Sequence, residues 1–147
     1  MDIRSSRRDM QLVIALLFVF LVGCTEVVTA HIRIVTYDNS KIDYSLRVEL
    51  AKLGWNKDEE SSGSAIGKTF FRHTSLPGYF IRIDRAEGKG VKITFVGVAR
   101  KYFSPNAVSA YRSLVVRLQA DFGNAVEYDV QTSSGQWIGD SSMTSMN

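Results

Sequence analysis

Histidine, serine and carboxylate side chains are the groups of this sequence that could take part in acid–base or nucleophilic chemistry. Neither of the two histidines, His31 and His73, has a second histidine two or four residues further on, the spacing that would place two ligands on one metal ion. No serine stands in a Gly-x-Ser-x-Gly segment. Asp84 and Glu87 could form a carboxylate pair, but both belong to a predicted hairpin, where acidic side chains commonly solvate the turn. We therefore expect no catalytic residue, no metal site and no cofactor, and both histidines on strand surfaces.

The segment GSAIGKTF, Gly63 to Phe70, ends like a phosphate-binding loop. That pattern requires four residues between its first glycine and the Gly-Lys pair, and only three follow Gly63 before Gly67. A phosphate-binding loop also leads from a strand into a helix, whereas here an acidic segment comes before and a β-rich segment follows. We expect no nucleotide partner, and we expect Lys68 to enter a strand.

The single cysteine, Cys24, stands at the end of an apolar run. Residues 1–11 are polar and include three arginines, and residues 12–22 are apolar without interruption. A membrane-spanning helix needs about 20 such residues, so the run is too short to span. Its proportions are those of the apolar core of a signal peptide.

The four residues Leu21-Val22-Gly23-Cys24 resemble the lipobox of bacterial lipoproteins. The resemblance implies that the Cys24 thiol receives a diacylglyceryl group, that the chain is cut after Gly23, and that the new amino terminus is acylated. Residues 1–23 would be the signal peptide, and residues 24–30 a lipidated tether. Two or three acyl chains make a firm anchor where one chain binds only marginally. The membrane would then be a partner, reached through the lipid on Cys24.

The residue after the cysteine is Thr25, not the aspartate that usually retains such lipoproteins at the inner membrane. The resemblance therefore implies the outer membrane, facing the periplasm. Three alternatives stay open. Cys24 could be a buried structural cysteine, the leader could be an uncleaved membrane anchor, or Val28-Thr29-Ala30 could serve as an ordinary signal-peptidase site that releases a soluble chain starting at His31.

Length and charge set further limits. The chain has 147 residues, 45% of them hydrophobic, which suffices for one core and is too few for two ordinary domains. Removing the leader, with its three arginines and two aspartates, lowers the formal net charge from +3 to +2. This weak charge is not typical of a nucleic-acid-binding domain, so no nucleic-acid partner is expected. One cysteine also excludes an intrachain disulfide.

Hydrophobic periodicity predicts the element order βα-βββ-αβ after the tether. We expect an α+β fold: a five-stranded, mostly antiparallel sheet with two helices on one face, similar in plan to a ferredoxin-like sandwich. Ser40 and Ser104 are the predicted helix N-caps, and Gly54 should end the first helix. This domain should cover residues 31–131, and residues 132–147 should form a flexible tail. The predicted strands are 31–37, 66–73, 79–86, 91–99 and 125–131, and the predicted helices are 41–53 and 105–122.

Basic residues gather on two of the predicted strands and at their ends. A solvated sheet face would account for them, but on a domain held near a membrane they also suit anionic headgroups, peptidoglycan or an acidic envelope protein. We therefore expect a non-catalytic binding or assembly module on the periplasmic face of the outer membrane. The alternative is a small periplasmic hydrolase or ligand-binding lipoprotein, which a cleft joining His73 to a buried carboxylate would favour. The candidate binding residues are Arg82, Arg85, Lys92, Arg100 and Lys101.

Overall fold

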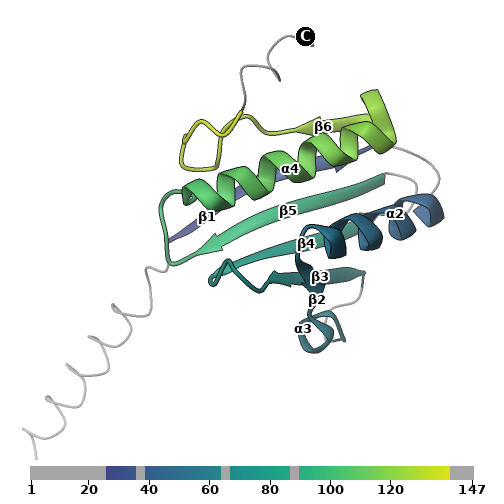
Figure 1. Cartoon of the computed structure of the whole chain (residues 1–147), viewed down its shortest axis with the longest axis horizontal. Coiled ribbons are helices and arrows are strands. Elements are labelled where there is room, and N and C mark those ends of the chain that lie inside the picture. Colours follow the sequence, from purple (N-terminus) through teal and green to yellow (C-terminus); the bar gives the residue numbers. More distant parts are fainter. Residues whose placement is uncertain (1–25, 36–38, 64–66, 87–89, 140–147) are drawn as a thin grey trace, which may run out of the picture.

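The computed structural model describes residues 26–35, 39–63, 67–86 and 90–139 (Figure 1). The predicted signal peptide and the lipobox, Cys24 included, lie outside the described residues.

Six strands of the described chain form one sheet in which every pairing is antiparallel (Figure 1). The strands are β1 (Val27–Ile34), β2 (Trp55–Lys57), β3 (Lys68–His73), β4 (Tyr79–Ala86), β5 (Gly90–Val98) and β6 (Val126–Tyr128). They lie in the order β2-β3-β4-β5-β1-β6, so the first strand of the chain pairs with β5 on one side and with β6 on the other. The sheet is therefore a meander of four strands extended by the two ends of the domain.

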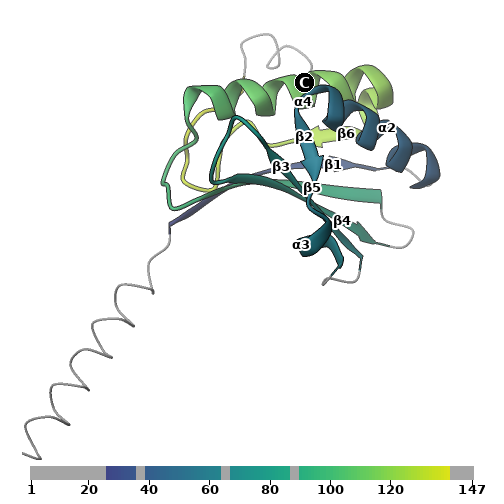
Figure 2. The ribbon, with the colours of Figure 1, turned by 60° about the horizontal axis from the view of Figure 1, so that its bottom comes forward.

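Two long helices, α2 (Asn39–Lys52) and α4 (Pro105–Phe122), lie side by side on one face of the sheet (Figure 2). A short helix, α3 (Glu59–Gly63), lies by the β2–β3 edge, and a 3₁₀ turn, η1 (Gly123–Ala125), leads into β6. The hydrophobic core fills the layer between the two long helices and the sheet. Its helical side chains are Ile42, Leu46 and Leu50 from α2, and Ala107, Tyr111, Leu114, Val115 and Leu118 from α4.

The predicted α+β class and the pair of helices on one face are confirmed. The predicted helix 105–122 coincides with α4, and the Ser104 hydroxyl accepts a hydrogen bond from the Ala107 N–H at 3.3 Å. The first helix begins at Asn39, so Ser40 lies inside it and the prediction of Ser40 as its N-cap is wrong. The end of a helix is set by a few neighbouring residues, which is why Ser104 predicts the start of α4 correctly.

The prediction of five strands and two helices is wrong, because the described chain has six strands and three helices. The additions, β2 and α3, lie between the predicted helix 41–53 and the predicted strand 66–73, where no element was expected. Three residues are too few to show a strand period, and β2 is held by Trp55, whose ring centre lies 5.0 Å from that of His73. Gly54, before it, has φ +85°, and a Cβ there would lie 2.8 Å from His73 Nε2. Helix α3 follows Asp58, whose carboxylate accepts a hydrogen bond from the Ser61 N–H at 3.2 Å.

The first strand begins earlier than predicted, at Val27. Residues 27–30 of the expected tether 24–30 are therefore part of β1, and Val28 and Ala30 are fully buried. The strand also ends at Ile34, short of the predicted end at residue 37. The same alternation of buried and outward side chains runs through the whole strand, so the predicted boundary between tether and domain at residue 31 is wrong.

The segment after β6 is also more ordered than the predicted flexible tail 132–147. Ile138 is fully buried, and the Gln136 side chain hydrogen-bonds the backbone of Phe103 in both directions, at 2.7 and 3.0 Å. The Arg112 guanidinium donates to the carbonyls of Ile138 and Gly139, at 2.8 Å each. These contacts join segments that are far apart in the sequence, so no local sequence pattern predicts them. The remainder of the predicted tail lies outside the described residues.

Candidate functional site

Two of the five candidate binding residues, Arg82 and Lys92, lie on the sheet face turned away from α2 and α4. Their strand neighbours Ile83 and Ile93 are buried in the core, and successive side chains of a strand point to opposite faces. The Arg82 Nε donates to the Asp84 carboxylate at 2.8 Å. Asp84 also stands directly opposite Lys92 in the β4–β5 register. Glu87, which could pair with Asp84, lies outside the described residues.

Arg85 lies on the opposite side of the sheet from Arg82, because three residues along a strand reverse the direction of the side chain. Its Nη1 donates to the hydroxyl of Thr69, a buried residue of β3, at 3.0 Å.

Arg100 and Lys101 follow β5, at the end of the sheet where β4 begins. The Arg100 guanidinium lies over the Tyr79 ring, 4.4 Å from its centre, and donates to the Pro77 carbonyl at 3.0 Å. Lys101 is exposed, with its Nζ 5.5 Å from the centre of the Tyr102 ring.

The structure does not bring these five residues together on one face. Arg100 and Lys101 lie beyond one end of β5, and Lys92 lies near the other end. Residues 93–99 lie between Lys92 and Arg100, and a strand rises about 3.3 Å per residue. The expected binding role of the five residues stays a prediction. Arg85 and Lys92 belong to one group and Arg100 and Lys101 to another, whereas Arg82, which is paired with Asp84, belongs to neither.

We call the first group the far end: Arg33, Val35, Asp84, Arg85 and Lys92. These residues line a hollow of about 290 Å³ together with Gly90 and Val91. Arg33 stands directly opposite Lys92 in the β1–β5 register, so two cations face each other across neighbouring strands. Sequence reasoning missed Arg33, because its neighbourhood depends on which strand pairs with β5 and in which register.

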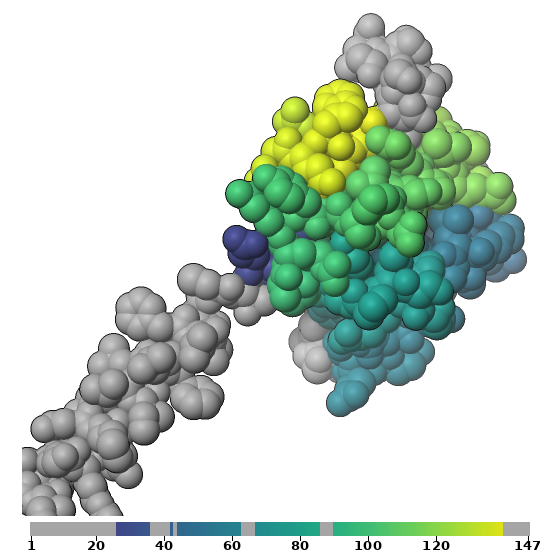
Figure 3. Space-filling model, turned by 60° about the vertical axis from the view of Figure 1, so that its left-hand side comes forward, coloured from purple at the N-terminus to yellow at the C-terminus, as the bar shows by residue number. Residues whose placement is uncertain are grey.

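We call the second group the near end: Glu26, Val27 and residues 99–102. Figure 3 views this end, where the purple start of β1 adjoins the green residues that follow β5. The Arg100 N–H donates to the Glu26 carbonyl at 3.1 Å, which extends the β1–β5 pairing past Val27. Ala99 makes this possible with φ +58°, a left-handed conformation that is uncommon for a residue other than glycine. The sequence predicted Arg100 and Lys101 as binding residues, but it did not predict that they lie beside the first residues of β1.

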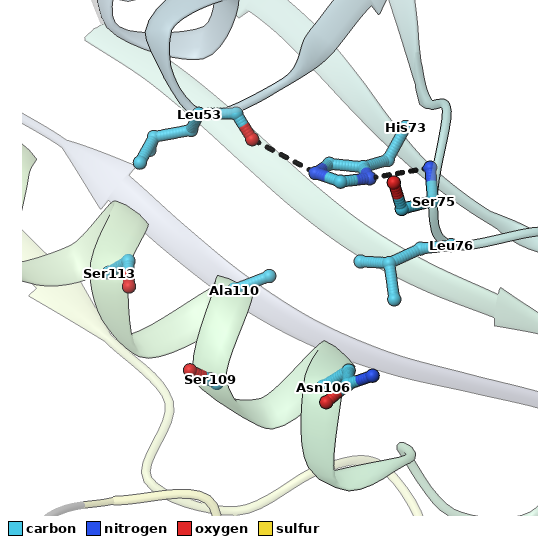
Figure 4. A pocket seen from close by; sticks show the side chains of 8 residues that line it. All are labelled: Leu53, His73, Ser75, Leu76, Asn106, Ser109, Ala110 and Ser113. Carbon is cyan, nitrogen blue, oxygen red and sulfur yellow. Dashed lines mark hydrogen bonds between the residues drawn. The ribbon is translucent and has the colours of Figure 1, made fainter.

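A groove of about 330 Å³ opens on the helix side of the sheet, between the end of α2, the β3–β4 turn and the first turns of α4 (Figure 4). None of the residues that line it has a carboxylate, so the cleft between His73 and a buried acid, which would favour a hydrolase, is not formed by this groove. The lining residues are Leu53, His73, Ser75, Leu76, Asn106, Ser109, Ala110 and Ser113.

Both ring nitrogens of His73 are engaged by the backbone (Figure 4). Nε2 lies 2.9 Å from the Leu53 carbonyl, to which it can only donate, and Nδ1 accepts from the Ser75 N–H at 3.1 Å. These partners select the neutral tautomer that is protonated at Nε2. Such an imidazole has no free lone pair with which to remove a proton, so His73 is held as a structural residue.

His31 lies on the outward face of β1, opposite Thr94 of β5. Its Nδ1 is buried without a hydrogen-bond partner among the described residues. Burial lowers the pKa of His31 below its usual value, nearby Lys92 lowers it further, and Asp129 opposes the change. The ring is therefore neutral at neutral pH.

Family models, curated proteins and solved structures were each compared with this chain, and none matches it. Functional reasoning therefore depends on the chain's own residues and their geometry.

Three further observations concern the sequence motifs. Lys68 is the exposed first residue of β3, which confirms that it enters a strand. No group of three or more His, Cys, Asp or Glu side chains in the described ranges could hold a metal ion. No helix in the same part of the chain is both long and apolar enough to cross a membrane.

Proposed function

We propose that this protein is a lipid-anchored envelope protein on the periplasmic face of the outer membrane, and that its domain is a non-catalytic binding or assembly module. The observation that carries the proposal is the start of β1 at Val27, three residues after Cys24. Cleavage after Gly23 keeps β1 whole and makes the only cysteine the first residue. The sheet then begins almost at the anchor.

The same observation argues against release by cleavage after Ala30. That cut would remove residues 27–30, half of β1, which pair with residues 95–98 of β5. It would also remove the buried side chains of Val28 and Ala30. Burying one valine side chain contributes about 1.5 kcal/mol or more, and the lost backbone pairing would expose part of β5.

The binding role is supported by the charges of the far end and by the hydrogen bonds of His73. The far end presents three cations and one carboxylate around a shallow hollow, a surface that suits an acidic envelope protein or the carboxylates of peptidoglycan. Both ring nitrogens of His73, the candidate general base, are hydrogen-bonded to the backbone. A surface that binds a partner therefore fits these residues better than a hydrolytic centre.

The experiment is labelling with palmitate in a bacterial host, followed by separation of the membranes. Wild type should incorporate the label and enter the outer-membrane fraction. Cys24→Ser should lose the label, keep its leader and leave that fraction, while its domain still folds. Thr25→Ser is the matched control, because it changes the neighbouring residue and keeps the thiol. A wild-type protein that takes up no palmitate would sink the lipoprotein assignment.

A ligand-binding lipoprotein is the second candidate, and the groove of Figure 4 favours it over a hydrolase. Its volume of about 330 Å³ and its mixed serine and aliphatic lining suit a small polar molecule. Native mass spectrometry of protein purified from envelopes should then show a retained small molecule. Ala110→Trp should displace that molecule by filling the groove, whereas Tyr44→Trp, on the exposed surface of α2, should not.

A further inference from the structure

The near end combines exposed apolar surface with positive charge. Val27 and Tyr102 are 52% and 51% exposed, large fractions for such side chains. Lys101 is exposed beside the Tyr102 ring, and Glu26 is the opposing acid at this end. Tyrosine is enriched where a membrane meets water, and lysine can lay its apolar stem on the hydrocarbon while its ammonium group stays at the headgroups.

This surface is held rigidly before it meets anything. The Arg100 N–H is bonded to Glu26, and its guanidinium donates to the Pro77 carbonyl. The Ser104 N–H donates to the Tyr79 hydroxyl at 2.8 Å, which fixes the other side of the turn. A preorganised surface loses little conformational entropy when it docks.

The distance from Cys24 brings this end to the lipid. Three Cα steps separate Cys24 from Val27, which is at most about 11 Å of extended chain. The far end lies the length of β1 away, roughly 24 Å for a strand of 8 residues. The attraction of anionic lipid for basic residues falls off within a Debye length of about 8 Å. With β1 pointing away from the membrane, only the near end lies within that range.

We propose that the near end is a membrane-contact surface for anionic phospholipid headgroups, with Lys101 as its exposed cation and with Val27 and Tyr102 at the apolar boundary. The inference rests on the proposed lipid anchor at Cys24. It adds an orientation to that function: the strands lead away from the membrane, and the far end is turned toward the periplasm.

The test is hydrogen exchange, read by mass spectrometry, on the lipidated mature protein in vesicles. One set of vesicles contains phosphatidylglycerol and the other only phosphatidylcholine. The amides of residues 99–102 should exchange more slowly on the anionic vesicles. Lys101→Ala should reduce that protection about fivefold, and Lys101→Glu should reduce it further, since each basic residue near such a surface contributes about a fivefold change in binding. Lys68→Glu is the control, because it makes the same charge change at an exposed lysine of β3.

The outcomes separate the two proposals. The mass of the intact protein shows first whether Cys24 carries lipid, and a protein without it would overturn the anchor and this inference together. A lipidated protein whose residues 99–102 exchange equally on both kinds of vesicle would overturn the inference alone. So would a loss of protection in Lys68→Glu as large as that in Lys101→Glu, since the effect would then depend on overall charge.

Discussion

The near end and the far end of the sheet carry basic residues that look alike in the sequence but have different surroundings. At the near end, Arg100 is bound to a ring and to carbonyls, and Lys101 stands among exposed apolar groups. At the far end, Arg33 and Lys92 face each other beside Asp84 around a hollow. The comparison shows that strand length and register decide which charges can act together. Under our proposals the first group meets lipid and the second meets a partner.

The largest effect should come from the core that both ends share. Leu114→Ala or Leu118→Ala should lower the free energy of unfolding by about 2 to 5 kcal/mol, because each side chain is fully buried between α4 and the sheet. Thermal unfolding measures the loss, with the exposed Val116→Ala as control. If hydrogen exchange then rose at one end only, the two ends would not form one cooperative unit.

The next effect tests what ties the C-terminal segment to the sheet. The Tyr111 hydroxyl lies 3.0 Å from the His31 carbonyl and 2.9 Å from the Asp129 carbonyl, at the junction of α4, β1 and the chain after β6. Tyr111→Phe leaves buried acceptors without this donor and should cost about 1 to 3 kcal/mol in chemical denaturation. Exchange should quicken in residues 129–139. Unchanged stability would mean that the segment is held by Gln136 and Arg112 alone.

Two smaller effects compare the backbone conformations at the two ends of β5. At the far end β5 begins with Gly90, at φ +81°, whereas at the near end it is followed by Ala99, at φ +58°. Ala99→Gly should therefore raise the unfolding free energy by about 1 kcal/mol, and Gly90→Ala should lower it by at least that amount. Equal changes of the same sign in thermal unfolding would contradict this difference between the ends.

The smallest effect is a change in the pKa of His31, which should respond to the charges of the far end and not to those of the near end. Lys92→Gln should raise the pKa of His31, measured by NMR titration, because Lys92 is the cation that contributes most to lowering it. Arg100→Gln, at the near end, should leave this pKa unchanged. Because the pKa of His31 is lower in the folded protein than in the unfolded chain, the unfolded chain takes up a proton at a higher pH. The free energy of unfolding should therefore fall as the pH drops below about 6.5, and His31→Gln should flatten this decline. An equal response to both substitutions would remove the distinction between the ends.

The sequence by itself determined the features that depend on a few neighbouring residues. Ser104 and the helical period of residues 105–122 predict α4 to the residue, and the predicted strand 79–86 coincides with β4. The apolar run before Cys24 predicts processing in the same local way. Each of these signals acts within one turn, one strand or one short motif.

Only the tertiary structure decided the features that depend on pairing. The start of β1 at Val27, the short strand β2, the packing of Ile138, and the separation of Lys92 from Lys101 all follow from which segments lie side by side and in which register. The same holds for His73, whose tautomer is selected by the Leu53 carbonyl across 20 residues of sequence. A hydrogen bond or a buried contact between distant segments produces no periodic pattern in the sequence. Each partner by itself is an ordinary polar or apolar residue, and only the fold places the two side by side.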